Sequence, residues 1–350
     1  MVWSSTPTEV ALTTLLSQPN EYDTYLPEDQ YPMDPFDRYP ENAEDAALIE
    51  AMREERMVAN DRWQSTTMRD VHAGDWIGDF EVLRPTAFNG PEQISLEVAA
   101  TGSIKTNIST SGFTNEGVQV TFNEEINVIK GDMHAIQSLV HPYTFQPSRA
   151  QSAGTDWRLC RGNQVVGTAF TTGSQYPEVV KEYKDDSYNP VVPEAYITDV
   201  AVKEGHVRSR VRYIYTKALT AAAGAGENFD LCLAGIVVIR ESQAAASDAE
   251  LGLLRDGRIG LGIYDQHMRG DPYVVLNLPG RLSLCFPRGI QSRQVADNVL
   301  TVEWTAKELR YQVDRKFGEL TGQIRSLELT EIQVQDSETY YPGLFSTVLK

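Results

Sequence analysis

The spacing of hydrophobic and polar residues along the 350-residue chain changes near residue 61. Before this point, Ala46, Ile49 and Met52 recur at three-residue intervals within residues 41–63, with acidic residues early in the segment and basic residues later. This pattern predicts one amphipathic helix of about three or four turns, because acidic side chains favour the start of a helix and basic ones its end. After residue 76 apolar and polar residues alternate, which is typical of strands with one buried face.

Two series of strand-like segments follow the helix. They are separated by residues 176–194, which are rich in proline and charge and have no period. Because the strands are short and no helix intervenes, both series favour antiparallel barrels or sandwiches over a βαβ fold. The second series opens with two strands around a turn at Lys203–Gly205, and its strands are numerous enough to close a barrel. The first series has strand runs at 94–104, 117–129, 155–162 and 164–173, and the second continues through 228–242, 255–265, 272–278, 280–287, 298–304, 307–320 and 322–334.

The sequence therefore predicts a mainly all-β fold with two antiparallel β-barrels in tandem. Residues 1–60 form an acidic N-terminal extension with the helix, and residues 61–175 form the first barrel. Residues 176–194 are the linker, and residues 195–350 form the second barrel with a C-terminal tail. Within the extension, residues 22–42 scatter prolines among tyrosines and acids, which offers aromatic side chains for contact with another surface.

Tryptophan and glycine mark the entrance of the first strand. Gly74 and Gly78 flank Trp76, and Trp63 lies shortly before them. Glycine lets the chain bend or lets another backbone approach closely, and a large indole can fill the closed end of a barrel. We interpret these four residues as a structural signature with Trp76 as a barrel plug; the alternative is an ordinary core tryptophan at a strand start.

The net formal charge is −18, from 49 acidic and 31 basic residues. This balance argues against a nucleic-acid partner, which requires a basic face, and against docking on anionic lipid. No apolar run approaches the roughly 18 residues of a membrane span, so we expect no integral membrane segment. The opening residues have neither signal-peptide nor transit-peptide features, which indicates either a cytosolic protein or a targeting segment that has been removed.

No residue pattern points to catalysis, a metal or a cofactor. The five histidines are scattered, and the chain contains no CxxC, HExxH, GxSxG or P-loop motif. Arg208, Arg210 and Arg212 alternate with apolar residues, which is typical of a solvated strand face. A row of arginines on an acidic protein is also a candidate protein-binding contact for an acidic partner.

Several of these segments together resemble a two-barrel, lipocalin-like family of plants, algae and cyanobacteria. The resemblance extends over Asp61–Val334, and its motifs are structural. Their order along the chain is the better evidence. They are residues 63–82, Arg208–Tyr215, Gly235–Glu241, Leu276–Pro287, Val302–Trp304 and Ser326–Glu331.

The best-characterised type of protein in that family is a chloroplast biogenesis factor for ATP synthase. The resemblance implies a non-catalytic assembly factor in the stroma, without its transit peptide, that binds the β and γ subunits of the soluble catalytic head. It supplies no catalytic residues and no cofactor. The alternatives are a lipocalin-like carrier of a small apolar ligand, such as a lipid, carotenoid or tetrapyrrole, and an enzyme with its site in one barrel mouth.

Overall fold

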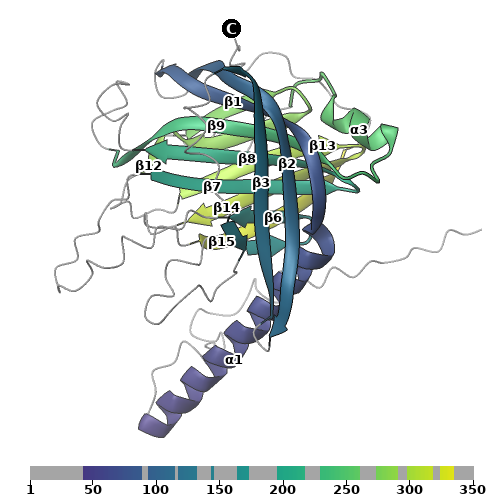
Figure 1. Ribbon diagram of the computed structural model, residues 1–350. Coiled ribbons are helices and arrows are strands. Elements are labelled where there is room, and N and C mark those ends of the chain that lie inside the picture. Colours follow the sequence, from purple (N-terminus) through teal and green to yellow (C-terminus); the bar gives the residue numbers. More distant parts are fainter. Residues whose placement is uncertain are drawn as a thin grey trace, which may run out of the picture. The chain divides into compact units, whose positions relative to one another are not determined.

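Figure 1 shows the computed structural model of the protein. Contacts divide the chain into two compact units, Met1–Arg56 and Met57–Lys350, and the division falls inside the first helix. All the strands belong to the second unit. The structure describes residues 42–88, 94–114, 117–131, 143–145, 164–172, 195–216, 229–260, 273–290, 298–317 and 324–334.

The predicted helix is present as α1, Ala43–Thr67, and its 25 residues make it longer than the sequence indicated. The side chain of Asn42 accepts a hydrogen bond from the backbone N–H of Asp45 at 2.9 Å, as an N-cap residue does. A short π-helical turn, η2 (Met68–His72), continues from α1, and the chain becomes extended at Ala73. No described helix is long and apolar enough to cross a membrane.

The larger sheet has ten strands among the described residues, and they pair antiparallel in the order β4-β3-β2-β1-β9-β8-β7-β6-β5, with β12 also pairing with β9. Most neighbours in this order are also consecutive strands along the chain, but β1 pairs with β9 across a long stretch of sequence. The strands are β1 (Gly74–Phe88), β2 (Ile94–Thr114), β3 (Gly117–Gly131), β4 (Tyr143–Phe145), β5 (Gln164–Val166), β6 (Ala169–Thr172), β7 (Ala195–Glu204), β8 (Val207–Thr216), β9 (Leu231–Ser242) and β12 (Gly289–Ile290).

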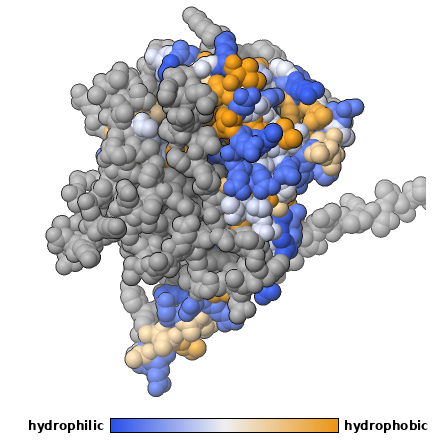
Figure 2. Space-filling view, in the orientation of Figure 1, coloured by the Kyte–Doolittle hydropathy of each residue, from blue (hydrophilic) through white to orange (hydrophobic). Residues whose placement is uncertain are grey.

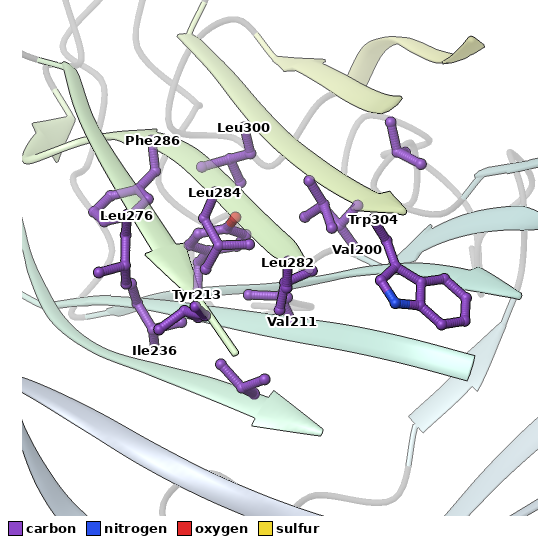
Figure 3. Close-up of a cluster of buried hydrophobic side chains, with 14 of the residues drawn as sticks. Val200, Val211, Tyr213, Ile236, Leu276, Leu282, Leu284, Phe286, Leu300 and Trp304 are labelled. Carbon is purple, nitrogen blue, oxygen red and sulfur yellow. The ribbon is translucent and has the colours of Figure 1, made fainter. Parts of the chain in front are cut away.

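The second sheet has five strands in the order β10-β11-β13-β14-β15. Its face packs on one face of β7–β9, and the buried side chains between them form the sandwich core. A short helix, α3 (Asp248–Leu254), follows β9. The strands are β10 (Tyr273–Leu278), β11 (Leu282–Pro287), β13 (Asn298–Ala306), β14 (Leu309–Phe317) and β15 (Ile324–Gln333). Members of the sandwich core labelled in Figure 3 are Val200, Val211, Tyr213, Ile236, Leu276, Leu282, Leu284, Phe286, Leu300 and Trp304.

The opposite face of β7–β9 is covered by β1–β3, which Figure 1 shows passing in front of it. The larger sheet thus rolls over on itself, and β7–β9 separate two interiors. Two apolar clusters lie in the rolled part. The Trp76 cluster comprises Met68, Trp76, Ile108, Val120, Phe122, Val165, Phe170 and Ala201. The Phe80 cluster comprises Phe80, Val82, Ala100, Ile104, Ile214, Val237 and Ile239.

The mainly β fold and the N-terminal helix are confirmed, but neither sheet closes into a barrel within the described strands. Strands from both predicted halves share the larger sheet, since β6 pairs with β7 and β1 with β9. The predicted linker 176–194 and the predicted strand 155–162 lie outside the described residues. The strand predicted at 255–265 is wrong over its described part, because residues 255–260 are irregular and only Ile259 makes a single β-bridge, to Pro279.

Candidate functional site

The predicted arginine row lies on β8, where successive side chains point to opposite faces of the sheet. Val207 and Val211 enter the sandwich core. Arg208, Arg210 and Arg212 point the other way, between β7–β9 and β1–β3, and their exposed fractions are 0%, 0% and 4%. The predicted solvated strand face is therefore wrong for this row: it is an interior face that β1–β3 cover.

Arg208 is paired with Glu241, its direct cross-strand neighbour on β9. Its Nε and Nη2 atoms donate to Oε2 of Glu241 at 2.9 and 2.6 Å. Burial alone would raise the pKa of Glu241, but the charges of Arg208 and Arg210 outweigh burial and hold that pKa below its usual value. The carboxylate therefore remains ionised at neutral pH although it is fully buried.

Arg212 is paired in the same way with Asp199, its cross-strand neighbour on β7. Two parallel bonds join them, Nε to Oδ1 at 2.6 Å and Nη2 to Oδ2 at 2.9 Å, which is the strong bidentate geometry of arginine with a carboxylate. Glu124 of β3 accepts from Nη2 of Arg212 at 3.1 Å. Burial alone would lower the pKa of Arg212, but Asp199 and Glu124 outweigh it and raise that pKa instead.

Arg210 lies between the two pairs and joins them. Its Nη1 donates to Glu124 at 2.5 Å and to Asp199 at 3.0 Å, and its Nη2 donates to Glu241 at 3.2 Å. Thr106 of β2 adds a hydroxyl that accepts from Arg210 and donates to Glu241. We call these seven residues the arginine network: Thr106, Glu124, Asp199, Arg208, Arg210, Arg212 and Glu241.

The arginine network lies between the two apolar clusters of the rolled part. On β2, Thr106 stands between Ile104 of the Phe80 cluster and Ile108 of the Trp76 cluster, and all three side chains are buried. Three guanidinium groups face three carboxylates, so the network carries no net charge. It links β2, β3, β7, β8 and β9, and its main chemical effect is to hold these strands in one register.

Aromatic rings close one end of the network. The guanidinium carbon of Arg208 lies 4.1 Å from the centre of the Trp76 ring, a cation–π distance, and the Trp76 indole N–H donates to the carbonyl of His72 at 2.9 Å. The His72 ring makes an edge contact with Phe170, with the centres 4.9 Å apart. Burial, with the nearby charges of Arg208 and Lys203, lowers the pKa of His72 well below its usual value, so this imidazole is neutral.

Gly74 and Gly78 lie at positions that disfavour a side chain, each for a different reason. Gly74 has a φ of +119°, which favours glycine. At Gly78 an added Cβ would lie 1.9 Å from the carbonyl oxygen of Arg240 on β9, so glycine permits the close β1–β9 approach. Trp76 is fully buried in its cluster, whereas Trp63 on α1 is 47% exposed and does not join it.

Sequence reasoning missed the acidic half of the network, which comprises Glu124, Asp199 and Glu241. One signal was available: a hairpin turning at Lys203–Gly205 places Asp199 opposite Arg212. Glu124 comes from β3, 86 residues from Arg210, and no local pattern identifies it. No group of three or more histidine, cysteine or acidic residues suited to a metal ion occurs in the described part of the chain.

Comparison with known proteins finds similarity only among solved structures, of which three chains match. No family model matches the chain, and no curated protein matches it. A solved structure of a protein of unknown function from the DUF3598 family, from Nostoc punctiforme, is similar at 17% sequence identity and a TM-score of 0.42, over 77% of this chain and 99% of that one. Membership of the two-barrel, lipocalin-like family stays a prediction.

Proposed function

We propose that this protein is a non-catalytic assembly factor for the soluble catalytic head of chloroplast ATP synthase. It would act in the stroma and bind the β and γ subunits transiently. We further propose that the rolled part and the sandwich core correspond to the two lipocalin-like barrels of the family that the sequence resembles.

The observation that supports this function is the neutrality of the arginine network. Because its three arginines are compensated internally, the formal charge of −18 belongs to the rest of the chain. A strongly acidic exterior attracts basic partner surfaces over long range and raises the rate of encounter. Transient capture of unassembled subunits requires fast encounter more than tight binding.

The structure changes which surfaces are candidates for partner contact. Arg208, Arg210 and Arg212 are buried, so their role as a protein-binding contact stays a prediction that would require β1–β3 to open. The aromatic segment 22–42 lies outside the described residues, apart from Asn42. Figure 2 shows hydrophobic and hydrophilic residues side by side on the described part of one face.

The outward face of β1 is a specific candidate for the docking surface. Trp76 and Phe80 point inward, whereas Asp75, Ile77 and Asp79 are exposed, and the exposed fraction of Ile77 is 58%. An exposed apolar side chain between two acids suits a basic partner with a small apolar depression. Contact through this face leaves the buried arginine network undisturbed.

Affinity capture from a stromal extract tests the proposal. We expect the purified chain to retain ATP synthase β and γ subunits. The β1 variant, which combines Ile77→Ser, Asp75→Asn and Asp79→Asn, should retain smaller amounts of both subunits. Ile259→Ser is the matched control, because Ile259 is 53% exposed on a different element. Failure of the unchanged chain to retain either subunit would refute the function, whereas equal losses in the β1 variant and the control would refute only the docking surface.

A further inference from the structure

A second buried arginine, Arg315 on β14, lies in the sandwich core and differs from the network arginines. Its exposed fraction is 0%. Nε, Nη1 and Nη2 have no hydrogen-bond partner among the described residues, and no described carboxylate pairs with them. Its cross-strand neighbours are Leu300 on β13 and Leu327 on β15, both of which are buried and apolar.

Two further polar groups at this end of the sandwich core also lack partners in the described part of the chain. They are the hydroxyl of Tyr196 and Oδ1 of Asn298, in residues that are 1% and 2% exposed. Tyr196 stacks on Phe317 with ring centres 5.3 Å apart, and Asn298 is the cross-strand neighbour of Phe317. The guanidinium carbon of Arg315 lies 4.9 Å from the Phe317 ring centre and 5.7 Å from that of Tyr196.

A cation in an apolar interior is strongly unfavourable unless an anion and hydrogen-bond acceptors compensate it. The network arginines satisfy this requirement within the chain: Arg208 and Arg212 each have a carboxylate directly across the strand pair. Arg315 has leucine at both equivalent positions. A site for an external anion needs buried hydrogen-bond donors that have no partner, and the guanidinium of Arg315 and the hydroxyl of Tyr196 are such donors among the described residues.

We propose that Arg315 and Tyr196 form a binding site for the carboxylate of an amphiphilic acid whose apolar chain lies along the sandwich core. One positive charge in an apolar setting is balanced by a monoanion, and the planar fork of arginine matches a planar carboxylate. Leu300, Leu327 and Phe317 provide the apolar surroundings that an acyl chain favours.

The hydroxyl of Tyr196 can donate a second hydrogen bond to the same carboxylate. Burial raises the pKa of Tyr196, although the charge of Arg315 and the nearby side chains of Arg315 and Thr198 oppose the rise, and the hydroxyl therefore stays protonated at neutral pH. The site does not depend on the assembly-factor function and can exist without it. If the protein is instead a carrier of an apolar ligand, this site is where the ligand would bind, and the ligand would be an acid.

Laurate binding to the purified, delipidated full chain tests the site by isothermal titration calorimetry, with dodecanol and acetate as matched probes. We expect one laurate per chain, at least tenfold weaker binding of dodecanol, and at least tenfold weaker laurate binding by Arg315→Met. Arg310→Met is the control variant, because Arg310 lies on the opposite face of β14, and it should bind laurate as the unchanged chain does. Tight acetate binding that depends on Arg315 would also support a carboxylate site, for a small acid.

The thermal midpoint of the ligand-free variants separates a binding role from a structural one. If Arg315 awaits an external anion, Arg315→Met removes an uncompensated charge and should raise the midpoint. A lowered midpoint in Arg315→Met, together with no binding of laurate or acetate by the unchanged chain, would overturn the proposal and indicate a carboxylate partner within the chain. Equal laurate binding by Arg315→Met and the unchanged chain would also overturn it, and none of these results bears on subunit capture.

Discussion

Arg208 and Arg315 show two ways in which single residues of this protein bury a positive charge. Both are fully buried on strands that face an apolar cluster. Arg208 has Glu241 as its cross-strand neighbour, whereas Arg315 has leucines. The first arrangement is self-sufficient and stabilises a register, and the second is complete only when another anion is present.

Glu241→Gln tests the arginine network at the residue scale. Removing one carboxylate leaves Arg208 and Arg210 without their shared counter-charge in a buried site, and we expect a loss of about 3–5 kcal/mol in the free energy of unfolding. Glu97→Gln is the matched control, because Glu97 pairs with Arg84 at the surface and should lose at most about 1 kcal/mol. Urea unfolding measures both, and similar losses would contradict a buried, coupled network.

Glu303 on β13 predicts a specific pH dependence of stability. It is 3% exposed, and burial raises its pKa to about 7. A carboxyl group whose pKa is raised on folding stabilises the fold while protonated, and this contribution is lost as the pH rises from its unfolded pKa near 4.5 to about 7. We expect Glu303→Gln to become more stable than the unchanged chain by up to about 3 kcal/mol above pH 7 and to show no such gain at pH 4. Unfolding free energies that differ by the same amount at both pH values would exclude this assignment.

At the residue scale, the sequence analysis identified the arginine row but not its surroundings. Alternation along β8 shows that the three arginines share a face. It does not show which face of the sheet another layer covers, because that depends on β1–β3 folding across it. Arg315 did give a signal that was missed: in residues 307–317 it alternates in phase with Tyr311, Val313 and Phe317, the apolar positions that share its face of the strand.

Two elements depend on local features that the sequence displays. The β1–β9 contact favours a glycine at position 78, where an added Cβ would meet backbone atoms of Arg240 and Glu241. Helix α3 begins at a capping box in which Ser247 and Glu250 bond each other's backbone N–H groups. The sequence analysis offered either a bend or a close approach for this glycine, whereas α3 was missed because its seven residues were too few for a clear helical period.

Gly78→Ala tests the close approach of β1 to β9. The added methyl group would clash with backbone atoms of Arg240 that cannot rotate away, so we expect a loss of about 2 kcal/mol or more in unfolding free energy. Gly252→Ala is the matched control, because its added methyl group meets nothing within 4 Å in α3. There alanine should stabilise by about 0.5–1 kcal/mol through its helix propensity. A Gly78→Ala protein as stable as the control in thermal unfolding would show that β1 and β9 are not held as described.

For the second unit as a whole, the central feature is that β7–β9 serve two interiors at once. The sequence predicted most of the described strands and the β7–β8 hairpin, but it gave β2 only about half its length and merged β5 and β6 into one strand. It did not predict that one sheet continues through both halves, because β1 and β9 pair over about 160 residues of sequence and such pairing leaves no local mark. Since one interior is neutralised by its own ion pairs, the acidic excess lies elsewhere on the molecule.

The most direct test of the proposed function is the binding of the purified chain to isolated ATP synthase β and γ subunits. The association rate is measured with the subunits immobilised on a sensor surface, at salt concentrations from about 0.05 M to 0.5 M. Capture steered by an acidic exterior predicts association with at least one subunit and an association rate that falls about tenfold or more over this range. Absence of binding at the lowest salt concentration, or an association rate that does not change with salt, would contradict the account.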